Sequence, residues 1–224
     1  MLKGVIFDMD GTITLTEQLH YKSFNEVIKE HGVNDYTFEE QITKYAGSGS
    51  AKTFEAVFAA RGLKVSPEEI EKCVAKKKGL YTKIVQESEI TVVDGVKEFV
   101  KKIHEAGLKK IIATGNSNLD IVRDILKKVG LLEYFPQIIS INEVARGKPF
   151  PDVFLEAAKR IDCVPTECVI LEDSANGIEA AHAAGIRSIA LETTLKSEAL
   201  VAAGATYTVK NYNYITDEIL YGNK

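Results

Sequence analysis

Cysteine is scarce in this chain of 224 residues, which contains only Cys73, Cys163 and Cys168. These three do not form the closely spaced pairs typical of zinc ligands, and their odd number argues against a framework of disulfides. The N-terminal residues also lack the long apolar segment and the small-residue cleavage site of a secretory signal. We therefore expect a protein of the reducing cytoplasm, whose cysteines are small core residues.

Long apolar runs and an excess of positive charge are absent as well. No apolar segment approaches the length of a transmembrane helix, which is about 20 residues. The formal net charge of -4 at pH 7 provides no general attraction to nucleic acid or to an anionic membrane. The hydrophobic content of 45% is sufficient for a full core. These features predict a globular protein whose partner is a small molecule.

Short apolar segments bounded by turn residues recur along the chain and indicate buried parallel strands. Helical patterns lie between them, as at Val96, Phe99, Val100 and Ile103, which recur at helical spacing. This alternation predicts an α/β fold with a Rossmann-like parallel sheet core flanked by helices. The expected strands are residues 4–8, 110–114, 137–141, 168–172, 188–191 and 206–209.

The region from Thr16 to Thr91 interrupts this alternation, because it contains several helical patterns and no convincing strand. Thr16 is a possible N-cap at its beginning. Within it, the segment from Ser66 to Glu69 combines a capping box with a proline, Pro67, at the first helical position. We therefore predict an α-helical cap domain at residues 16–91, inserted into a catalytic core made of residues 1–15 and 92–224.

Polar residues follow the expected strands where each strand ends. In an open parallel sheet, ligands bind beyond the carboxyl ends of the strands, so these residues are expected to meet at one edge. A pair such as Asp8 and Asp10 alone could merely cap a turn, but the combination with a lysine and a second acidic pair favours catalysis. The residues are Asp8, Asp10, Thr114, Gly115, Asn116, Lys148, Glu172 and Asp173.

Acidic residues, a hydroxyl group and a lysine at one edge match the needs of phosphoryl transfer, in which positioning and charge neutralisation supply most of the catalysis. Two anions at about 4 Å repel by roughly 4 kcal/mol at an effective dielectric of 20, so a carboxylate needs cations to approach a phosphate. A magnesium ion held by Asp8 and Asp173 would provide one, and Lys148 another. Thr114 and the amide of Gly115 could hold the phosphate oxygens.

Asp8 and Asp10 are two residues apart, so their side chains can reach a common site as the strand ends. Two carboxylates can then divide the work. One attacks phosphorus and forms an aspartyl-phosphate, and the other protonates the leaving oxygen and later activates water.

With these motifs in this order, the chain resembles a phosphatase of the haloacid dehalogenase superfamily with a helical cap. It is most similar to the branch that contains β-phosphoglucomutase and sugar-phosphate phosphatases. The resemblance covers essentially the whole chain. Its four motifs are Asp8-x-Asp10-Gly11-Thr12, Thr114, Lys148 within Gly-Lys-Pro-x-Pro-Asp, and Glu172-Asp173-Ser174-x-x-Gly177.

The resemblance implies that Asp8 is the nucleophile and Asp10 the acid/base. It also implies that Mg²⁺ is held by the Asp8 carboxylate, the Asp10 carbonyl and Asp173, with Glu172 acting more indirectly. A cap that closes over the substrate is implied too, with His20 at its hinge, and a monomer is the simplest expectation for a cap that must swing freely. One lysine of the run at residues 76–78 would reach the active site, but the family pattern does not identify which.

The cap loop at residues 47–52 departs from the mutase pattern, in which an arginine binds a second phosphate. Here the loop has no arginine, and Lys52 could replace it only as a point charge. We therefore expect hydrolysis of a small phosphorylated metabolite, with a sugar phosphate as the expected substrate, and keep a phosphosugar mutase as the alternative. The expected contacts to the substrate are Gly115, Asn116, His20, Ser48, Gly49, Ser50 and Lys52.

Two other classes fit less well. A signalling receiver domain also has a phosphorylated aspartate near a lysine, but it is smaller and has no helical insertion after the first acidic motif. A haloacid dehalogenase proper needs no metal and would not require Asp10 and Asp173. Asn118 is equally interpretable as an N-cap or a substrate contact. The remaining histidines, His31, His104 and His182, are interpreted as structural or solvated, without metal-ligand partners.

Overall fold

Six parallel strands form one sheet in the spatial order β3-β2-β1-β4-β5-β6. In this computed structural model, which describes residues 1–222, each strand lies within one residue of its expected bounds, and the predicted α/β fold is confirmed. The central strand β1 pairs with β2 on one side and β4 on the other. The strands are β1 (Gly4–Phe7), β2 (Lys109–Thr114), β3 (Ile138–Ser140), β4 (Cys168–Glu172), β5 (Arg187–Leu191) and β6 (Tyr207–Val209).

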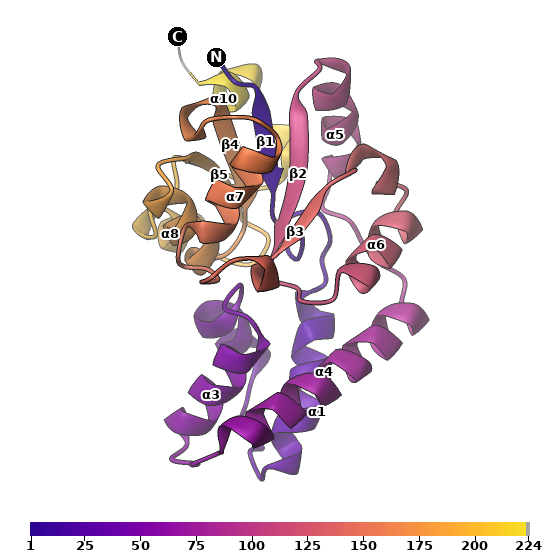
Figure 1. The fold of residues 1–224 in the computed structure, drawn as a ribbon, viewed down its shortest axis with the longest axis vertical. Coiled ribbons are helices and arrows are strands. Elements are labelled where there is room, and N and C mark those ends of the chain that lie inside the picture. Colours follow the sequence, from indigo (N-terminus) through magenta and orange to yellow (C-terminus); the bar gives the residue numbers. More distant parts are fainter. Residues whose placement is uncertain (223–224) are drawn as a thin grey trace.

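Helices cover both faces of this sheet (Figure 1). Side chains of β1 alternate between the faces, as expected for a strand. Val5 and Phe7 belong to the larger core, together with α5 (Val96–Glu105), α6 (Leu119–Lys128) and α10 (Asp217–Tyr221). Ile6 belongs to the opposite core, together with α7 (Asp152–Arg160) and α8 (Ala175–Ala183). A short helix α9 (Ser197–Ala202) packs beside α8.

The remaining helices lie together beyond the carboxyl ends of the strands (Figure 1). They have an apolar core of their own, which contains Phe24, Phe54 and Phe58. Together these helices form the cap. They are α1 (Glu17–Glu30), α2 (Phe38–Glu40), a π-helical turn (Gln41–Tyr45), α3 (Ser50–Ala60) and α4 (Pro67–Glu87).

Two connections between the sheet and the cap run side by side. Leu15 donates its backbone N–H to Thr91 O at 2.9 Å, and Val93 donates to Ile13 O at 3.0 Å. Thr14 and Val92 form an antiparallel bridge between these bonds. The two connections therefore form one hydrogen-bonded hinge region, close to the domain boundaries that the sequence predicts.

Two predicted helix starts have different outcomes. Ser66 accepts a hydrogen bond from the backbone N–H of Glu69 at 3.3 Å, with Pro67 at the first position of α4, which confirms the N-cap half of the predicted capping box. The return bond from the Glu69 side chain to the Ser66 backbone is not formed among residues 1–222. Thr16 precedes α1, but its hydroxyl makes no capping bond to that helix and donates to Asp10 instead. No helix among residues 1–222 is long and apolar enough to cross a membrane.

Candidate active site

Two adjacent strand ends place the acidic motifs next to each other. Phe7 of β1 pairs with Leu171 of β4, so Asp8 and Glu172 leave the sheet side by side. Gly115 and Asn116 follow β2, on the other side of β1. A pocket between this edge and the cap is lined from the sheet side by Asp8, Asp10, Gly115, Asn116, Ser117, Asn118, Glu172, Asp173 and Ser174.

Lys148 connects the two acidic motifs. Its Nζ lies 2.5 Å from Asp8 Oδ1 and 2.6 Å from Glu172 Oε2, and its side chain is fully buried. Burial alone would lower the pKa of Lys148, but the charges of Asp8 and Glu172 raise it above the usual value. Lys148 therefore stays charged beside Asp8 throughout the neutral range.

Three carboxylates crowd this position. Oxygens of Asp8, Glu172 and Asp173 lie within 4.8 Å of one another, and all three side chains are buried. Burial and the negative charge of Glu172 raise the pKa of both Asp8 and Asp173. Lys148 can neutralise only one of three negative charges. A buried, all-oxygen site with this charge fits a hard divalent cation such as Mg²⁺.

The glycines of the motifs are required by the positions of these carboxylates. Gly11 has φ +80°, and a Cβ atom there would lie 2.0 Å from Asp173 Oδ2. A Cβ atom at Gly177 would lie 2.0 Å from the carboxyl carbon of Glu172. Asp173 is further oriented by Thr12 Oγ1, which donates to its Oδ1 at 3.1 Å, and by a hydrogen bond from Thr194.

Asp10 faces the cap. His20 Nε2 lies 3.1 Å from Asp10 Oδ1, Tyr81 OH donates to the same oxygen at 3.3 Å, and Thr16 Oγ1 also donates to it. Burial alone would raise the pKa of Asp10, but His20, the hydrogen bond from Thr16 and the charge of Lys77 together lower it. Asp10 is thus an ionised carboxylate held by donors from the hinge and the cap.

Lys77 is the member of the 76–78 run that reaches this network. Its Nζ lies 2.8 Å from His20 Nδ1 and stands over the rings of Phe24 and Tyr81, at 4.4 and 4.8 Å from their centroids. Burial lowers the pKa of Lys77 to about 8. Burial and the charge of Lys77 also lower the pKa of His20, so a neutral ring can accept from Lys77 and donate to Asp10.

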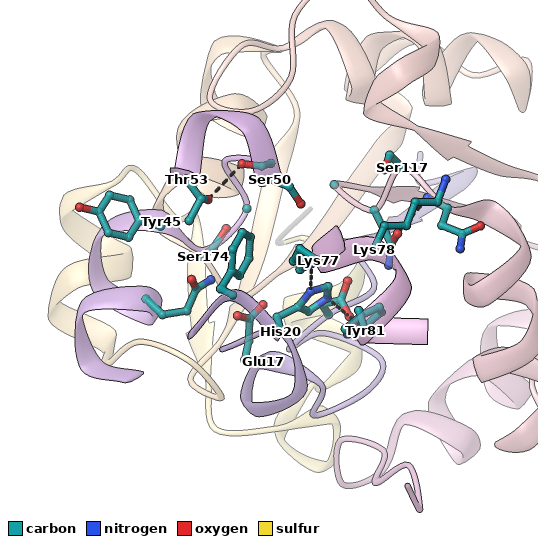
Figure 2. A pocket seen from close by; sticks show the side chains of 18 of the residues that line it. Glu17, His20, Tyr45, Ser50, Thr53, Lys77, Lys78, Tyr81, Ser117 and Ser174 are labelled. Atoms are coloured by element: carbon teal, nitrogen blue, oxygen red, sulfur yellow. Dashed lines mark hydrogen bonds and ion pairs between the residues drawn. The ribbon is translucent and has the colours of Figure 1, made fainter. Parts of the chain in front are cut away.

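Glu17 is a pocket residue that sequence reasoning missed. It lies in the first turn of α1, near His20 and Tyr81 (Figure 2). Its Oε2 atom is buried without a hydrogen-bond partner among residues 1–222. Burial and the negative charge of Asp10 raise the pKa of Glu17 to about 7. An acidic residue after a helix N-cap is common, so the sequence offered no signal that this one points into a pocket.

The cap loop lies against the motif after β4. Asn176 Nδ2 donates to Ala46 O at 2.8 Å, and a Cβ atom at Gly47, whose φ is +76°, would lie 2.9 Å from Ser174 Oγ. These contacts join the cap loop directly to the core. Gly47, Gly49 and Ser50 line the pocket.

Four residues expected at the substrate do not line this pocket, and one of them, Lys148, is buried against Asp8 and Glu172. Ser48 donates its hydroxyl to Tyr45 O at 2.6 Å, within its own loop. Lys52 Nζ stands over the ring of Phe150, 5.6 Å from its centroid. Thr114 is buried, and its Oγ1 accepts the backbone N–H of Asn116 at 3.0 Å, so it shapes the turn that carries Asn116. The polar lining of the pocket is otherwise supplied by the cap, from Glu17, His20, Gln41, Thr53, Lys77, Lys78 and Tyr81.

Comparisons with known proteins agree with this geometry. The family model described as Haloacid dehalogenase-like hydrolase matches residues 5–191. The chain is 30% identical to the phosphorylated carbohydrates phosphatase of Thermotoga maritima, over 93% of this chain and 94% of that protein. It is 32% identical to the fructose-1-phosphate phosphatase YqaB of Escherichia coli, over 83% of this chain and 94% of that protein. A crystal structure of β-phosphoglucomutase from Clostridium difficile superposes with a TM-score of 0.85 and 23% identity, covering 97% of this chain and 95% of that one, which shows a shared fold.

Proposed function

Since the chain belongs to the family of haloacid dehalogenase-like hydrolases and is an enzyme of the phosphatase type, we propose that it hydrolyses a sugar phosphate with Mg²⁺, through a phosphoryl group carried on Asp8. The observation that carries this proposal is the division between the two aspartates. Asp8 lies among Lys148 and the acidic residues of the core, and Asp10 faces the cap. One carboxylate is thus set for attack and the other for proton transfer.

Asp8 is assigned as the nucleophile. Lys148 holds its Oδ1 atom at 2.5 Å, so Oδ2 is the oxygen that we assign to attack on phosphorus. Asp8, Asp173 and the backbone carbonyl of Asp10 would hold Mg²⁺, and Glu172 would support them indirectly. When bound, the ion neutralises charge on the phosphoryl group as it is transferred. The phosphate would lie against Lys148 and the backbone amides at Gly115 and Asn116.

Asp10 is assigned as the acid/base. Its lowered pKa leaves it ionised in the free enzyme, in the form that accepts a proton from water. A nearby phosphate dianion raises the pKa of a carboxyl group, which favours the protonated form needed to protonate the leaving oxygen. The donors from Thr16, His20 and Tyr81 position this carboxylate between the cap and the core.

The leaving group is proposed to be a sugar because the cap side of the pocket presents many hydrogen-bonding groups. Glu17 contributes a carboxylate oxygen with no partner among residues 1–222, and Lys78, Asn116 and Asn118 lie around the same space. Such a lining matches a molecule with several hydroxyl groups, which would satisfy these atoms on binding. Both phosphatase relatives named above act on phosphorylated sugars.

Water, and not a second sugar hydroxyl, is the proposed acceptor of the phosphoryl group. The cap loop offers no arginine for a second phosphate, and Lys52 contacts Phe150 outside the pocket. We also propose that the enzyme is a monomer and acts in a reducing cytoplasm. Neither proposal bears on the chemistry.

A panel of hexose, pentose and polyol phosphates, assayed for release of inorganic phosphate, tests this function. It should include nucleotides, phosphoglycolate and pyrophosphate as competitors. We expect sugar phosphates to give the highest kcat/KM. In parallel, β-glucose 1-phosphate should be supplied with a catalytic amount of the glucose bisphosphate. Accumulation of glucose 6-phosphate without free phosphate would identify a mutase and contradict hydrolysis.

A further inference from the structure

A second group of metal-ligating atoms lies in the cap, outside the pocket. His31 Nε2 is 3.4 Å from Glu69 Oε1 and 3.6 Å from Cys73 Sγ, and the three ligand atoms lie within 4.8 Å of one another. His31 follows α1, and Glu69 and Cys73 lie in the first two turns of α4. The sequence predicts no metal-ligand partner for His31, which lies 38 and 42 residues from Glu69 and Cys73, and the folded cap corrects this by bringing the three together.

The two separations from His31 match those of ligands that share a small tetrahedral ion, and the third, between Glu69 and Cys73, is at most 4.8 Å. Zinc bonds of about 2.0–2.1 Å to nitrogen and oxygen and about 2.3 Å to sulfur place such ligands roughly 3.3–3.6 Å apart. The observed pairs at 3.4 and 3.6 Å need little rearrangement to admit an ion. Three protein ligands would leave the fourth position for water.

The surroundings of His31 prepare it as a ligand. Its Nδ1 lies 3.1 Å from Val27 O and donates there, so the lone pair of Nε2 faces Glu69 and Cys73. The ring packs against Phe58, with centroids 4.9 Å apart, which limits its rotation. Cys73 is 2% exposed, but the Glu69 side chain is 41% exposed and provides an entry path from solvent.

We propose that His31, Glu69 and Cys73 form a site with three protein ligands for a borderline-soft divalent metal of the zinc class, which fastens the end of α1 to the beginning of α4. Thiolate and imidazole ligands select zinc or cobalt over magnesium, so the site differs in metal from the all-oxygen cluster at Asp8. His20 lies on α1, roughly 16 Å from His31 along the helix axis at 1.5 Å per residue. Lys77 lies on α4, roughly 12 Å from Glu69 by the same measure. The ion would therefore stabilise the part of the cap that positions these residues.

Cobalt(II) titration of the metal-free full-length protein tests this site, because a thiolate ligand gives a charge-transfer absorption that an all-oxygen site does not. We expect one equivalent of this absorption in the wild-type protein. Cys73→Ser should abolish it. Cys168→Ser is the matched control, since Cys168 is also a free buried cysteine but lies in β4. The absorption should persist in that variant.

Thermal unfolding with saturating Mg²⁺ present gives an independent measurement. Zn²⁺ at a hundredfold excess over its Kd should raise the Tm of the wild type by about 5 °C or more. Glu69→Gln changes a partly exposed residue and should keep the fold, while weakening Zn²⁺ binding at least about tenfold. A wild-type protein without the thiolate absorption would overturn the proposal. Equal stabilisation of the wild type and Glu69→Gln by Zn²⁺ would do the same.

Discussion

His20 Nε2 lies 3.1 Å from Oδ1 of Asp10, so a residue of the first cap helix directly contacts a carboxylate of the core motif. Lys77, from the last cap helix, extends this contact, because its Nζ lies 2.8 Å from the other ring nitrogen of His20, Nδ1. Two cap helices therefore hold the carboxylate that we propose as the acid/base, so we expect the position of the cap to affect proton transfer.

Replacement of Lys77 tests the cap side of the network. Because burial lowers its pKa to about 8, wild-type kcat/KM should fall as the pH rises through about 8 and the positive charge is lost. Lys77→Met should lower kcat/KM at pH 7 by roughly 10- to 100-fold, the effect of losing one charged contact, and should remove that alkaline limb. Lys76→Met is the control, since Lys76 is exposed and pairs with Glu30. Identical pH profiles for wild type and Lys77→Met would refute this role.

Glu17 should make the free enzyme less stable as the pH rises. Its folded pKa of about 7 lies above the usual 4.5, so the folded state retains a proton that the unfolded state releases between those pH values. Stability is therefore lost from about pH 4.5 to 7 and stays reduced above it. Glu17→Gln should raise the free energy of unfolding by roughly 1–3 kcal/mol at pH 8 and change little at pH 4. Glu26→Gln, at an exposed position of the same helix, should show no such pH-dependent gain in urea titrations.

Two helical glycines should respond in opposite ways to alanine. Gly177→Ala would put a Cβ atom 2.0 Å from the Glu172 carboxyl carbon, which displaces a partner of Lys148. We expect a lower Tm and a large loss of kcat. Gly79→Ala meets no atom within 4 Å and should stabilise α4 by about 0.5–1 kcal/mol with activity unchanged. A Gly177→Ala enzyme with normal kcat would contradict the role of Glu172.

Metal dependence should follow the ionisation of the acidic cluster. EDTA should abolish phosphate release, and Mg²⁺ should restore it. Because the pKa values of Asp8 and Asp173 are raised, protons compete with the ion, and the apparent Kd for Mg²⁺ should increase as the pH falls. Asp173→Asn should reduce kcat/KM by at least about 100-fold at a fixed Mg²⁺ concentration. Full activity of that variant in EDTA would exclude the assigned metal site.

The sheet and its acidic edge were predictable because they depend on local signals. Short apolar segments bounded by turn residues located each strand, and the carboxyl ends of parallel strands share one edge, which placed Asp8 near Glu172. The side-chain directions in the cap were not predictable in this way. Thr16 has the sequence of a helix cap, yet its hydroxyl binds Asp10. Lys77 is distinguished from Lys76 only by burial against Phe24 and Tyr81, which requires the packed helices.

The central claim is that Asp8 carries the phosphoryl group, and acid quenching during turnover tests it most directly. The quenched enzyme should be digested and its peptides analysed by mass spectrometry. We expect one phosphoryl group on Asp8 in the wild type, and neither this modification nor turnover in Asp8→Asn. Phosphorylation of a different residue, or an Asp8→Asn enzyme that releases phosphate at the wild-type rate, would contradict the mechanism.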